Sequence, residues 1–359
     1  MKNKKVAIIG TVGIPAKYGG FETLVENLTH YLAEDFEMTV YCSSKAYDEK
    51  LATYNNAKLE YLDLNAHGVQ SILYDIVSMI KAKDFDVLLV LGDSGCTFLP
   101  ILKFFSKAKI IVNIDGLEWK REKWGRFAKS FLKFSEQIAV EYADAVVVDN
   151  KVIQDYVTDT YAKEGTLITY GADHVEKIAI SADVSKQFPF LNDKYAFTVC
   201  RIEPENNLHI IIEAFSQQNT LPLIIIGNWK SSQYGMELLN KYATIDHIHL
   251  LDPIYDQKIL NQIRSNAYVY LHGHSAGGTN PSLVEAMFLG LPIFAYGVNY
   301  NRETTENSAV YFSDAMELQT LIKNIDESNL KSIGNKMSEI SNRRYRWNLI
   351  CDKYAQLFA

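Results

Sequence analysis

The chain has 359 residues, of which 48% are hydrophobic and 22% are charged, a composition typical of a globular protein of about two domains. Its formal net charge of −7 argues against nucleic-acid binding driven by overall charge, so we expect no nucleic-acid partner. The four cysteines form no Cys-x-x-Cys pair, which speaks against a structural zinc site or a disulfide framework and favours a reducing, cytoplasmic location.

The amino terminus predicts a first strand rather than a leader sequence. Lysines precede an apolar run at residues 6–9, but that run is too short for a signal peptide and a glycine-containing loop follows it. No stretch of the chain approaches the roughly 18 apolar residues that a membrane-spanning helix needs.

In the first half of the chain, Val- and Ile-rich segments alternate with amphipathic ones. We expect strands at 6–10, 38–42, 59–64, 87–92, 110–114, 145–149 and 167–170. We expect helices at 21–33, 69–81, 122–142 and 151–160. Continuous apolar strands separated by helices indicate a parallel sheet that is covered on both faces.

The same alternation restarts after a polar, irregular stretch at 172–194, which we interpret as a linker. The second set of strands is expected at 196–200, 223–227, 248–251, 267–271, 293–296 and 309–312, and residues 317–359 should be largely helical. The pattern predicts an α/β fold of two doubly wound, Rossmann-like domains whose ligand-binding strand ends face a cleft. We place these domains at 1–175 and 176–340, with a carboxyl-terminal helix at 341–359 that packs back on the first domain.

Residues 272–287 predict an anion-binding site. A buried strand leads into a loop of small residues, and a helix then opens at Pro281 with Asn280 as its N-cap. Free backbone N–H groups and the positive end of the helix dipole favour a phosphate or diphosphate there. Glu285, about one turn into the helix, could accept hydrogen bonds from sugar hydroxyls. The alternative is an ordinary tight loop with a capped helix and a solvated glutamate.

The first βα loop, residues 10–22, is too long and wrongly spaced for the G-x-G-x-x-G dinucleotide turn, and the second strand ends without an acidic residue. Both absences count against an NAD(P)-dependent enzyme, and the lack of a Walker A motif excludes a P-loop NTPase. Gly19 and Gly20, just ahead of a helix, would let backbone amides approach a phosphate or sugar closely. A flexible loop explains them equally well.

A metal site is not expected. The triplet Asp84-Phe85-Asp86 resembles a metal–diphosphate motif, but it precedes a strand at the edge of the sheet away from the ligand-binding ends. We interpret it as a solvated turn.

Residues 113–121 follow the carboxyl end of a strand, where catalytic groups are expected. Asp115 and Glu118 could bind hydroxyls or act as a base, and Trp119 offers a stacking face for a sugar ring. The alternative is a charged loop with a partly buried tryptophan.

Residues 119–134 form a local basic and amphipathic segment in an otherwise acidic protein, as expected of a surface that rests on anionic lipid. The nearby cluster at 103–107 favours the same interpretation. A core-facing stripe with a solvated basic face explains the spacing as well.

Arg201 closes the first strand of the second half. A guanidinium there could bind a diphosphate as a bidentate, permanently charged partner. An ordinary surface ion pair is the alternative.

Together these residues resemble the retaining, nucleotide-sugar-dependent glycosyltransferases of the GT-B type, over essentially the whole chain. More narrowly, residues 18–22, 115–119, 201–207 and 274–287 resemble the bacterial branch of polysaccharide rhamnosyltransferases, which build capsules and O-antigens. The resemblance implies that the carboxyl-terminal domain binds the nucleotide sugar and that Glu285 holds the nucleotide ribose. It further implies that donor phosphates are met by Arg201, by the loop and helix start at Gly278, Thr279, Asn280 and Ser282, and by the closing loop at Gly19 and Gly20.

Three positions depart from the family pattern. Gly277 stands where a glutamate usually contacts the donor sugar, Asn206 replaces a lysine, and Asp115 replaces a histidine. The first two changes reduce the grip on the sugar and remove a positive charge at the diphosphate. A smaller hydroxyl network would suit a deoxy sugar such as L-rhamnose, so we hypothesise dTDP-rhamnose as the donor.

The sequence therefore predicts a hexosyltransferase, specifically a rhamnosyltransferase of bacterial surface polysaccharide synthesis, with retention implied by the resemblance. We expect Asp115, Glu118 and Arg201 to take part in catalysis, and the acceptor to bind at Asp115, Glu118, Trp119 and Arg121. No cofactor or metal is expected, since the helix dipole and Arg201 supply positive charge at the diphosphate. The hypothesis extends to a polyprenyl-diphosphate-linked saccharide acceptor and to peripheral contact of residues 119–134 with the inner membrane face. Two alternatives remain, a GT-B-like sugar-nucleotide epimerase and a non-catalytic nucleotide-sugar-binding subunit.

Overall fold

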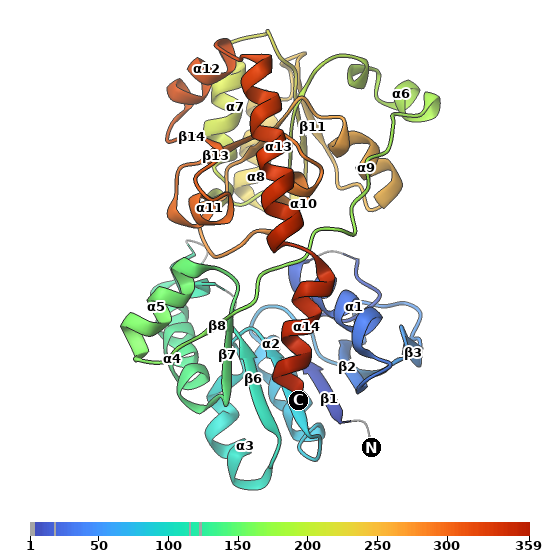
Figure 1. The fold of residues 1–359 in the computed structure, drawn as a ribbon, viewed down its shortest axis with the longest axis vertical. Coiled ribbons are helices and arrows are strands. Elements are labelled where there is room, and N and C mark those ends of the chain that lie inside the picture. Colours follow the sequence, from blue (N-terminus) through green and yellow to red (C-terminus); the bar gives the residue numbers. More distant parts are fainter. Residues whose placement is uncertain (1–3, 18, 115, 122–123) are drawn as a thin grey trace. The chain divides into compact units, whose positions relative to one another are not determined.

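The computed structural model describes residues 4–17, 19–114, 116–121 and 124–359. The chain forms two compact units: Met1–Tyr170 with Trp347–Ala359, and Gly171–Arg346. The chain therefore enters the second unit after residue 170 and returns to the first at residue 347, close to but not at the limits of 175 and 340 that we predicted from sequence. Figure 1 shows this return as the red helix α14 (Trp347–Phe358) among the blue and green elements of the first unit.

The first unit is built on an eight-stranded sheet with the order β3-β4-β2-β1-β5-β6-β7-β8. Its strands are β1 (Lys5–Ile9), β2 (Glu37–Ser43), β3 (Thr53–Tyr54), β4 (Ala57–Leu62), β5 (Val87–Leu91), β6 (Lys109–Asn113), β7 (Ala145–Val148) and β8 (Thr166–Leu167). All neighbouring pairs are parallel except the short β3–β4 hairpin. The helices are α1 (Gly20–Leu32), α2 (Gln70–Lys81), α3 (Leu99–Phe105), α4 (Arg126–Tyr142), α5 (Lys151–Tyr161) and α14. The central strands are buried along nearly their whole length, as expected for a sheet covered on both faces.

Helix α14 completes the core of the first unit although it is the last element of the chain. Its buried Tyr354 accepts a hydrogen bond from Asn113 Nδ2 at 2.8 Å, at the end of β6. Its buried Phe358 packs edge-on against Phe36, with 5.4 Å between ring centroids. The helix thus covers part of the sheet that the preceding 340 or so residues leave uncovered.

The second unit has a fully parallel six-stranded sheet with the order β11-β10-β9-β12-β13-β14. Its strands are β9 (Ala196–Val199), β10 (Leu223–Ile226), β11 (Ile248–Leu251), β12 (Val269–His272), β13 (Ile293–Tyr296) and β14 (Val310–Phe312). Its helices are α6 (Ala182–Gln187), α7 (Leu208–Ser216), α8 (Gln233–Tyr242), α9 (Gln257–Ser265), α10 (Pro281–Phe288), α11 (Asn299–Thr304), α12 (Ala315–Lys323) and α13 (Glu327–Arg344). The long helix α13 lies across the front of this sheet in Figure 1.

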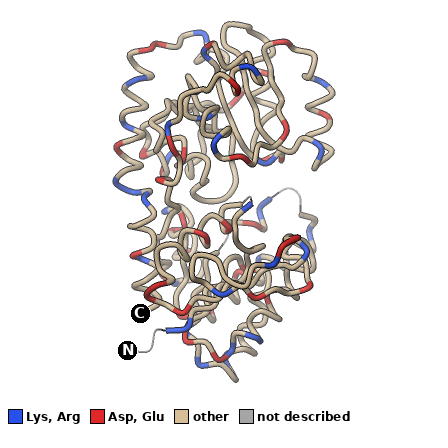
Figure 2. Tube along the Cα trace, turned by 90° about the vertical axis from the view of Figure 1, so that its right-hand side faces the viewer, with Lys and Arg blue, Asp and Glu red and all other residues tan. Residues whose placement is uncertain are grey.

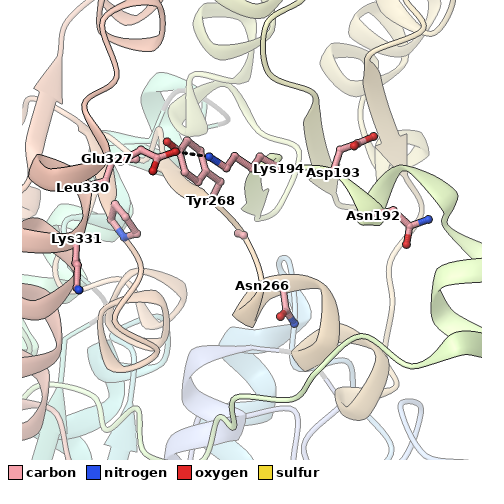
Figure 3. Close-up of a pocket in the computed structure, with 10 residues that line it drawn as sticks. Asn192, Asp193, Lys194, Asn266, Tyr268, Glu327, Leu330 and Lys331 are labelled. Atoms are coloured by element: carbon pink, nitrogen blue, oxygen red, sulfur yellow. Dashed lines mark hydrogen bonds and ion pairs between the residues drawn. The ribbon is translucent and has the colours of Figure 1, made fainter.

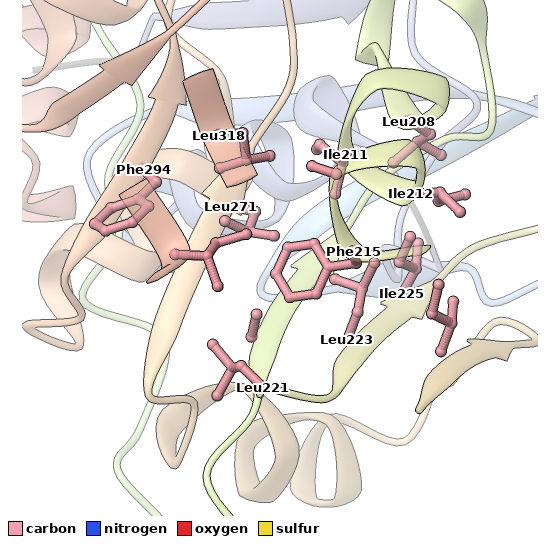
Figure 4. Packing of buried hydrophobic residues seen from close by; sticks show 14 of the residues in the cluster. Leu208, Ile211, Ile212, Phe215, Leu221, Leu223, Ile225, Leu271, Phe294 and Leu318 are labelled. Atoms are coloured by element: carbon pink, nitrogen blue, oxygen red, sulfur yellow. The ribbon is translucent and has the colours of Figure 1, made fainter. Parts of the chain in front are cut away.

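The core of the second unit lies between helices and the sheet. Side chains of α7 and α12, such as Phe215 and Leu318, meet strand side chains such as Leu223, Leu271 and Phe294 (Figure 4). Several helices begin at a side chain that accepts a hydrogen bond from a first-turn N–H, including Asp256, Asp314 and Asp326. These caps satisfy donors that the helix itself cannot pair.

Most expected strands and helices are confirmed to within about two residues. The predicted linker, however, contains α6, which is capped by Ser181 and buries only Val184, too little apolar surface to give a clear helical period. Helix α3 was also missed. Its apolar residues surround it on all sides, and Ile101 and Phe104 remain exposed. Helix α4 begins at Arg126 rather than at residue 122, after Gly125.

Positive and negative residues are interspersed along the traces of both units (Figure 2), and the described residues therefore offer no long basic track for a nucleic acid. Among the residues that the structure describes, no helix has both the length and the apolar character needed to cross a bilayer.

One buried carboxyl group in the first unit should make the stability of the protein depend on pH. Asp75 on α2 is 3% exposed and accepts a hydrogen bond of 2.6 Å from Ser94 Oγ. Gly95 permits this approach, since a Cβ on it would stand 2.3 Å from Asp75 Cβ. Burial raises the pKa of Asp75 to about 7.

The folded state therefore binds this proton more tightly than the unfolded state, where the pKa is about 3.9. The contribution of the protonated Asp75 side chain to the free energy of unfolding is complete below about pH 4 and is lost as the pH rises through about 7. We expect Asp75→Asn to raise the Tm above pH 7 by a few degrees and to leave it little changed near pH 4. Thermal unfolding across pH 4–8 measures this, with the exposed Asp84→Asn as control. Parallel profiles for Asp75→Asn and the wild type would contradict it.

Candidate functional site

The second unit places two loops together at the carboxyl edge of its sheet. Strand β9 pairs with β12, and from these two strands the chain winds in opposite directions, toward β11 and toward β14. Such a reversal of strand order is the usual ligand site of an open α/β sheet. The loop after β9 carries Arg201, and the loop after β12 carries residues 273–280.

These two loops are joined by direct hydrogen bonds. His274 Nδ1 lies 2.9 Å from Asn206 Oδ1, and Asn207 Nδ2 donates to the carbonyl of Gly273 at 2.8 Å. A side chain at position 273 would collide with the Asn206 carbonyl, 2.0 Å from the Cβ position. Asn206 also donates to the carbonyl of Arg201 at 2.7 Å. The residue that replaces the family lysine is therefore a structural link between the loops.

Helix α10 begins as its sequence predicts. Asn280 Oδ1 accepts from the backbone N–H of Ser282 at 3.0 Å and from its hydroxyl at 2.8 Å. Tyr270 Oη, reaching up from β12, donates to Ser282 Oγ at 3.0 Å. Thr279 is buried and Gly278 half-buried. The helix start is thus held on the sheet, and the dipole of α10 places positive potential at this loop.

Glu285 is not a solvated glutamate. Its Oε2 accepts from Arg264 Nη1 at 2.6 Å and its Oε1 lies 3.1 Å from His174 Nε2, with the side chain 16% exposed. Burial acts to raise the pKa of Glu285, but Arg264 and His174 outweigh it and hold the pKa below its ordinary value. A charged carboxylate therefore stands about 6 Å along the helix from the α10 amino terminus, at 1.5 Å per residue.

Arg201 is exposed just past the end of β9. It forms no ion pair with any residue that the structure describes. A guanidinium at this position could contact an anion at the carboxyl edge of the sheet.

In the first unit, a buried carboxylate lies against the start of helix α1. Glu22 Oε1 accepts from Thr11 Oγ1 at 3.0 Å and from the Val12 N–H at 2.9 Å. Gly19 has φ +132°, and a Cβ on it would stand 1.9 Å from Glu22 Oε2, so this position favours glycine. Glu22 therefore joins α1 to the beginning of the loop that follows β1. Sequence analysis included this residue in the segment 18–22 but gave it no role.

The predicted acceptor loop carries groups that pair with each other. Glu118 Oε2 lies 2.7 Å from Arg121 Nε, and Glu118 Oε1 accepts from Trp124 Nε1 at 3.0 Å. Both Glu118 and Arg121 are largely shielded from solvent. Asp115 lies outside the residues that the structure describes.

Trp119 is tied to a buried glutamate that sequence analysis missed. Its indole N–H donates to Glu136 Oε2 at 3.0 Å, and Tyr156 and Tyr161 donate to Glu136 Oε1 at 2.5 and 2.6 Å. Lys133 Nζ stands 4.7 Å from the Trp119 ring centroid. An ammonium group therefore already lies over the ring that we expected to face a sugar. One feature of the sequence could have indicated this role of Glu136: it is a single carboxylate on the buried side of an amphipathic helix.

The segment 119–134 has both a buried and an exposed apolar side. Leu132 faces the core, as the core-stripe alternative requires. Phe127 and Phe134, however, are 95% and 54% exposed, and Phe104 on the adjoining helix α3 is 90% exposed. A core stripe does not explain these three aromatic side chains.

A separate open cavity of about 590 Å³ lies at the opposite, amino-terminal edge of the second sheet (Figure 3). An ion pair between Lys194 and Glu327 lies beside Tyr268 there. Because ligands of open α/β sheets bind at the carboxyl edge, we do not assign the main site to this cavity.

Within the described parts of the chain, no three His, Cys, Asp or Glu side chains cluster as metal ligands. Asp84 and Asp86 are exposed, and Asp86 Oδ2 accepts from the Lys5 N–H at 2.8 Å. The expectation that no metal is required stays a prediction.

The two halves of the chain match two families. Residues 3–173 match a Domain of unknown function (DUF1972), and residues 181–343 match the family Glycosyl transferases group 1. The Uncharacterized glycosyltransferase MJ1069 of Methanocaldococcus jannaschii is 21% identical over 390 residues, which span 100% of this chain and 99% of that protein.

Solved structures of similar fold cover nearly the whole chain. Sucrose-phosphate synthase from Thermosynechococcus elongatus has a TM-score of 0.83 at 17% identity, covering 99% of this chain and 98% of that one. Anabaena HepE in complex with UDP-glucose has a TM-score of 0.77 at 16% identity, covering 99% of both chains. The fold is thus the two-domain GT-B fold that the sequence predicted, and the chain is a glycosyltransferase.

The buried carboxylate beneath Trp119 yields a stability prediction. Glu136→Gln removes the charge that three aromatic donors and Lys133 share, and it leaves Lys133 without its anionic partner. We expect the free energy of unfolding to fall by about 2–4 kcal/mol in urea titrations followed by tryptophan fluorescence. Glu141→Gln, at an exposed position of the same helix, is the control and should change stability by less than about 0.5 kcal/mol. Equal losses in both variants would contradict a special role for Glu136.

Proposed function

We propose that the chain transfers a hexosyl group, L-rhamnose from dTDP-rhamnose, to a saccharide acceptor with retention of anomeric configuration. The observation that carries this proposal is the convergence of Arg201, the α10 amino terminus and the charged Glu285 at one edge of the second sheet. A nucleoside diphosphate carries matching groups: an anionic diphosphate and, next to it, the hydroxyl groups of its pentose, of which dTDP has the 3′-hydroxyl. HepE, whose structure contains UDP-glucose, supports a nucleotide sugar as the donor.

Each part of the donor has a partner in the second unit. The diphosphate would lie at the start of α10, with the backbone of Gly278, Thr279 and Asn280 and the side chain of Ser282 near its oxygens. Arg201 would add a charge-assisted contact. About one turn further along the helix, Glu285 would accept from the ribose.

Gly277 supports a deoxy sugar as the group transferred. This residue has φ +100°, a conformation in which a glutamate side chain would be strained. Position 277 thus has no carboxylate, and the backbone conformation there disfavours one. Fewer sugar hydroxyls can then be bound here, which suits rhamnose because it has no 6-hydroxyl.

The transfer step would rely on charge built into the protein. As the glycosidic bond breaks, negative charge develops on the departing diphosphate, and the α10 dipole and Arg201 would stabilise it without a metal. The acceptor would bind to the first unit at the loop containing Asp115, Glu118, Trp119 and Arg121, with Glu118 and Arg121 held in their ion pair. The Gly19–Gly20 turn would meet the donor phosphates through its backbone.

A non-catalytic nucleotide-sugar-binding subunit is the second candidate, because Gly277 removes a sugar contact. Such a subunit would have the same nucleotide site but would not transfer the sugar. Release of nucleoside diphosphate from dTDP-rhamnose in the presence of saccharide acceptors separates the two candidates.

The donor proposal predicts a nucleotide preference. In thermal-shift measurements with dTDP, UDP, GDP and ADP, we expect dTDP to stabilise the protein most. Glu285→Ala should weaken dTDP binding about tenfold or more in titration calorimetry, since a hydrogen bond to a charged acceptor is lost. Glu213→Ala, at an exposed site on α7, should bind as the wild type does. Stabilisation by none of the nucleotides would refute the transferase, and preference for UDP or GDP would refute rhamnose.

We further propose that the first unit rests on anionic lipid, where a polyprenyl-diphosphate-linked acceptor would be found. The supporting residues are exposed aromatic rings at two places, Phe127 in the first turn of α4 with Lys129 nearby in sequence, and Phe104 in the last turn of α3 next to Lys103. Exposed aromatic rings beside lysines are typical of interfacial contact.

Co-sedimentation with vesicles tests this surface. The double variant Phe104→Ser, Phe127→Ser should bind vesicles containing phosphatidylglycerol about tenfold less than the wild type, because two large apolar side chains no longer enter the interface. Val69→Ser, which removes an 86% exposed apolar side chain elsewhere on the same unit, is the matched control. Equal binding by all three proteins would rule the surface out.

A further inference from the structure

Arg264 contacts the nucleotide-site carboxylate from inside the second unit. It lies in the last turn of α9 and is 5% exposed. Its Nη1 donates to Glu285 Oε2 at 2.6 Å, and its Nε donates to Asn261 Oδ1, one turn earlier, at 2.7 Å. The guanidinium plane is therefore fixed at two points, one on its own helix and one on α10.

The surroundings exclude a direct role for Arg264 in binding a ligand. The space beside it is a cavity of about 10 Å³, lined by Phe197, Tyr270, Ser282 and Glu285 among others. That volume holds a single water at most. Arg264 thus touches Glu285 from the buried side, while the carboxylate keeps the limited exposure that a ligand on the other side needs.

The contact leaves Glu285 able to accept more hydrogen bonds. A carboxylate has about four lone-pair positions, and Arg264 takes one on Oε2 while His174 stands at Oε1. The contacts of Arg264 and His174 with different oxygens disfavour rotation of the carboxylate about its own axis. The remaining lone pairs therefore keep a preferred direction, which is what recognition of a sugar hydroxyl at a defined position requires.

We propose that Arg264 is a positioning residue that orients the Glu285 carboxylate for the pentose hydroxyl groups of the bound nucleotide, which are the 3′-hydroxyl alone in dTDP and the 2′- and 3′-hydroxyls in UDP. This inference rests on the proposed function, since it takes Glu285 as the ribose ligand. Lysine should not replace arginine here, because a single ammonium cannot serve Asn261 and Glu285 with the rigid fork of a guanidinium.

The test compares each nucleotide with an analogue that lacks the hydroxyls in question. Titration calorimetry measures binding of dTDP against 2′,3′-dideoxythymidine diphosphate, and of UDP against its 2′,3′-dideoxy counterpart. The proteins are the wild type, Arg264→Gln, Arg264→Lys and Glu285→Ala. Arg343→Gln, which breaks an exposed ion pair with Glu306 on the same unit, is the control. The readout is the affinity ratio of nucleotide to dideoxy analogue.

In the wild type and Arg343→Gln we expect this ratio to be about tenfold or more, the size of a hydrogen bond to a charged acceptor. In both Arg264 variants the ratio should fall below about threefold, while binding of the dideoxy analogue stays near the wild-type value. A purely structural role would weaken nucleotide and analogue in parallel and leave the ratio unchanged, and that result would overturn the proposal.

Glu285→Ala separates failure of this inference from failure of the proposed function. A ratio lost in Glu285→Ala but kept in both Arg264 variants refutes the role of Arg264 alone. A ratio unchanged in Glu285→Ala, or no binding of any nucleotide by the wild type, refutes the ribose site itself and the inference with it.

Discussion

The pairing of β9 with β12 is the interaction on which the proposed donor site depends. These strands are remote in sequence, yet Ala196 lies opposite Val269 and Phe197 opposite Tyr270. This register brings the loop of Arg201 against the loop of residues 273–280, where Gly273 lets the backbone of one loop touch the other. A shift of the register by one residue would turn Tyr270 away from Ser282 and separate His274 from Asn206. The position of the α10 start beside the Arg201 loop is therefore a property of the whole sheet.

Buried carboxylates organise the loops in both units. Glu22 binds the Val12 N–H, Glu136 binds the Trp119 indole, and Glu285 is itself bound by Arg264. Each carboxylate accepts more than one hydrogen bond inside the protein, where the low dielectric strengthens them and makes an unpaired donor costly. Two of the three thus support a loop, and Glu285 is the one that we propose as a ligand-binding group. Charged residues near the carboxyl edge of a sheet accordingly fall into two kinds: those proposed to contact a ligand, and those that position the loops or side chains around them.

The chain is a glycosyltransferase of GT-B fold, and its departures from the family pattern have local structural reasons. Asn206 links the two loops by hydrogen bonds that a lysine could not make from the same position. Gly277 adopts a left-handed conformation that a side chain would strain. At these two positions the loops of the proposed donor site thus carry one positive charge and one carboxylate fewer than the family pattern. This is the structural basis for proposing a deoxy sugar as the group transferred.

The sequence by itself determined the strands, most helices, the α10 start with its Asn280 cap, and the fold class, because apolar periodicity and capping act over a few neighbouring residues. It also named Glu285 and Arg201 as candidate donor-binding residues. It could not reveal that Arg264 orients Glu285, that Glu136 lies under Trp119, or that α14 completes the first unit. The partners in these contacts are separated along the chain by 21 positions for Arg264 with Glu285 and by 17 for Trp119 with Glu136. The separation is 241 positions for Asn113 with Tyr354. Only the tertiary structure decided them, because they depend on how helices and strands pack, and no local pattern encodes that geometry.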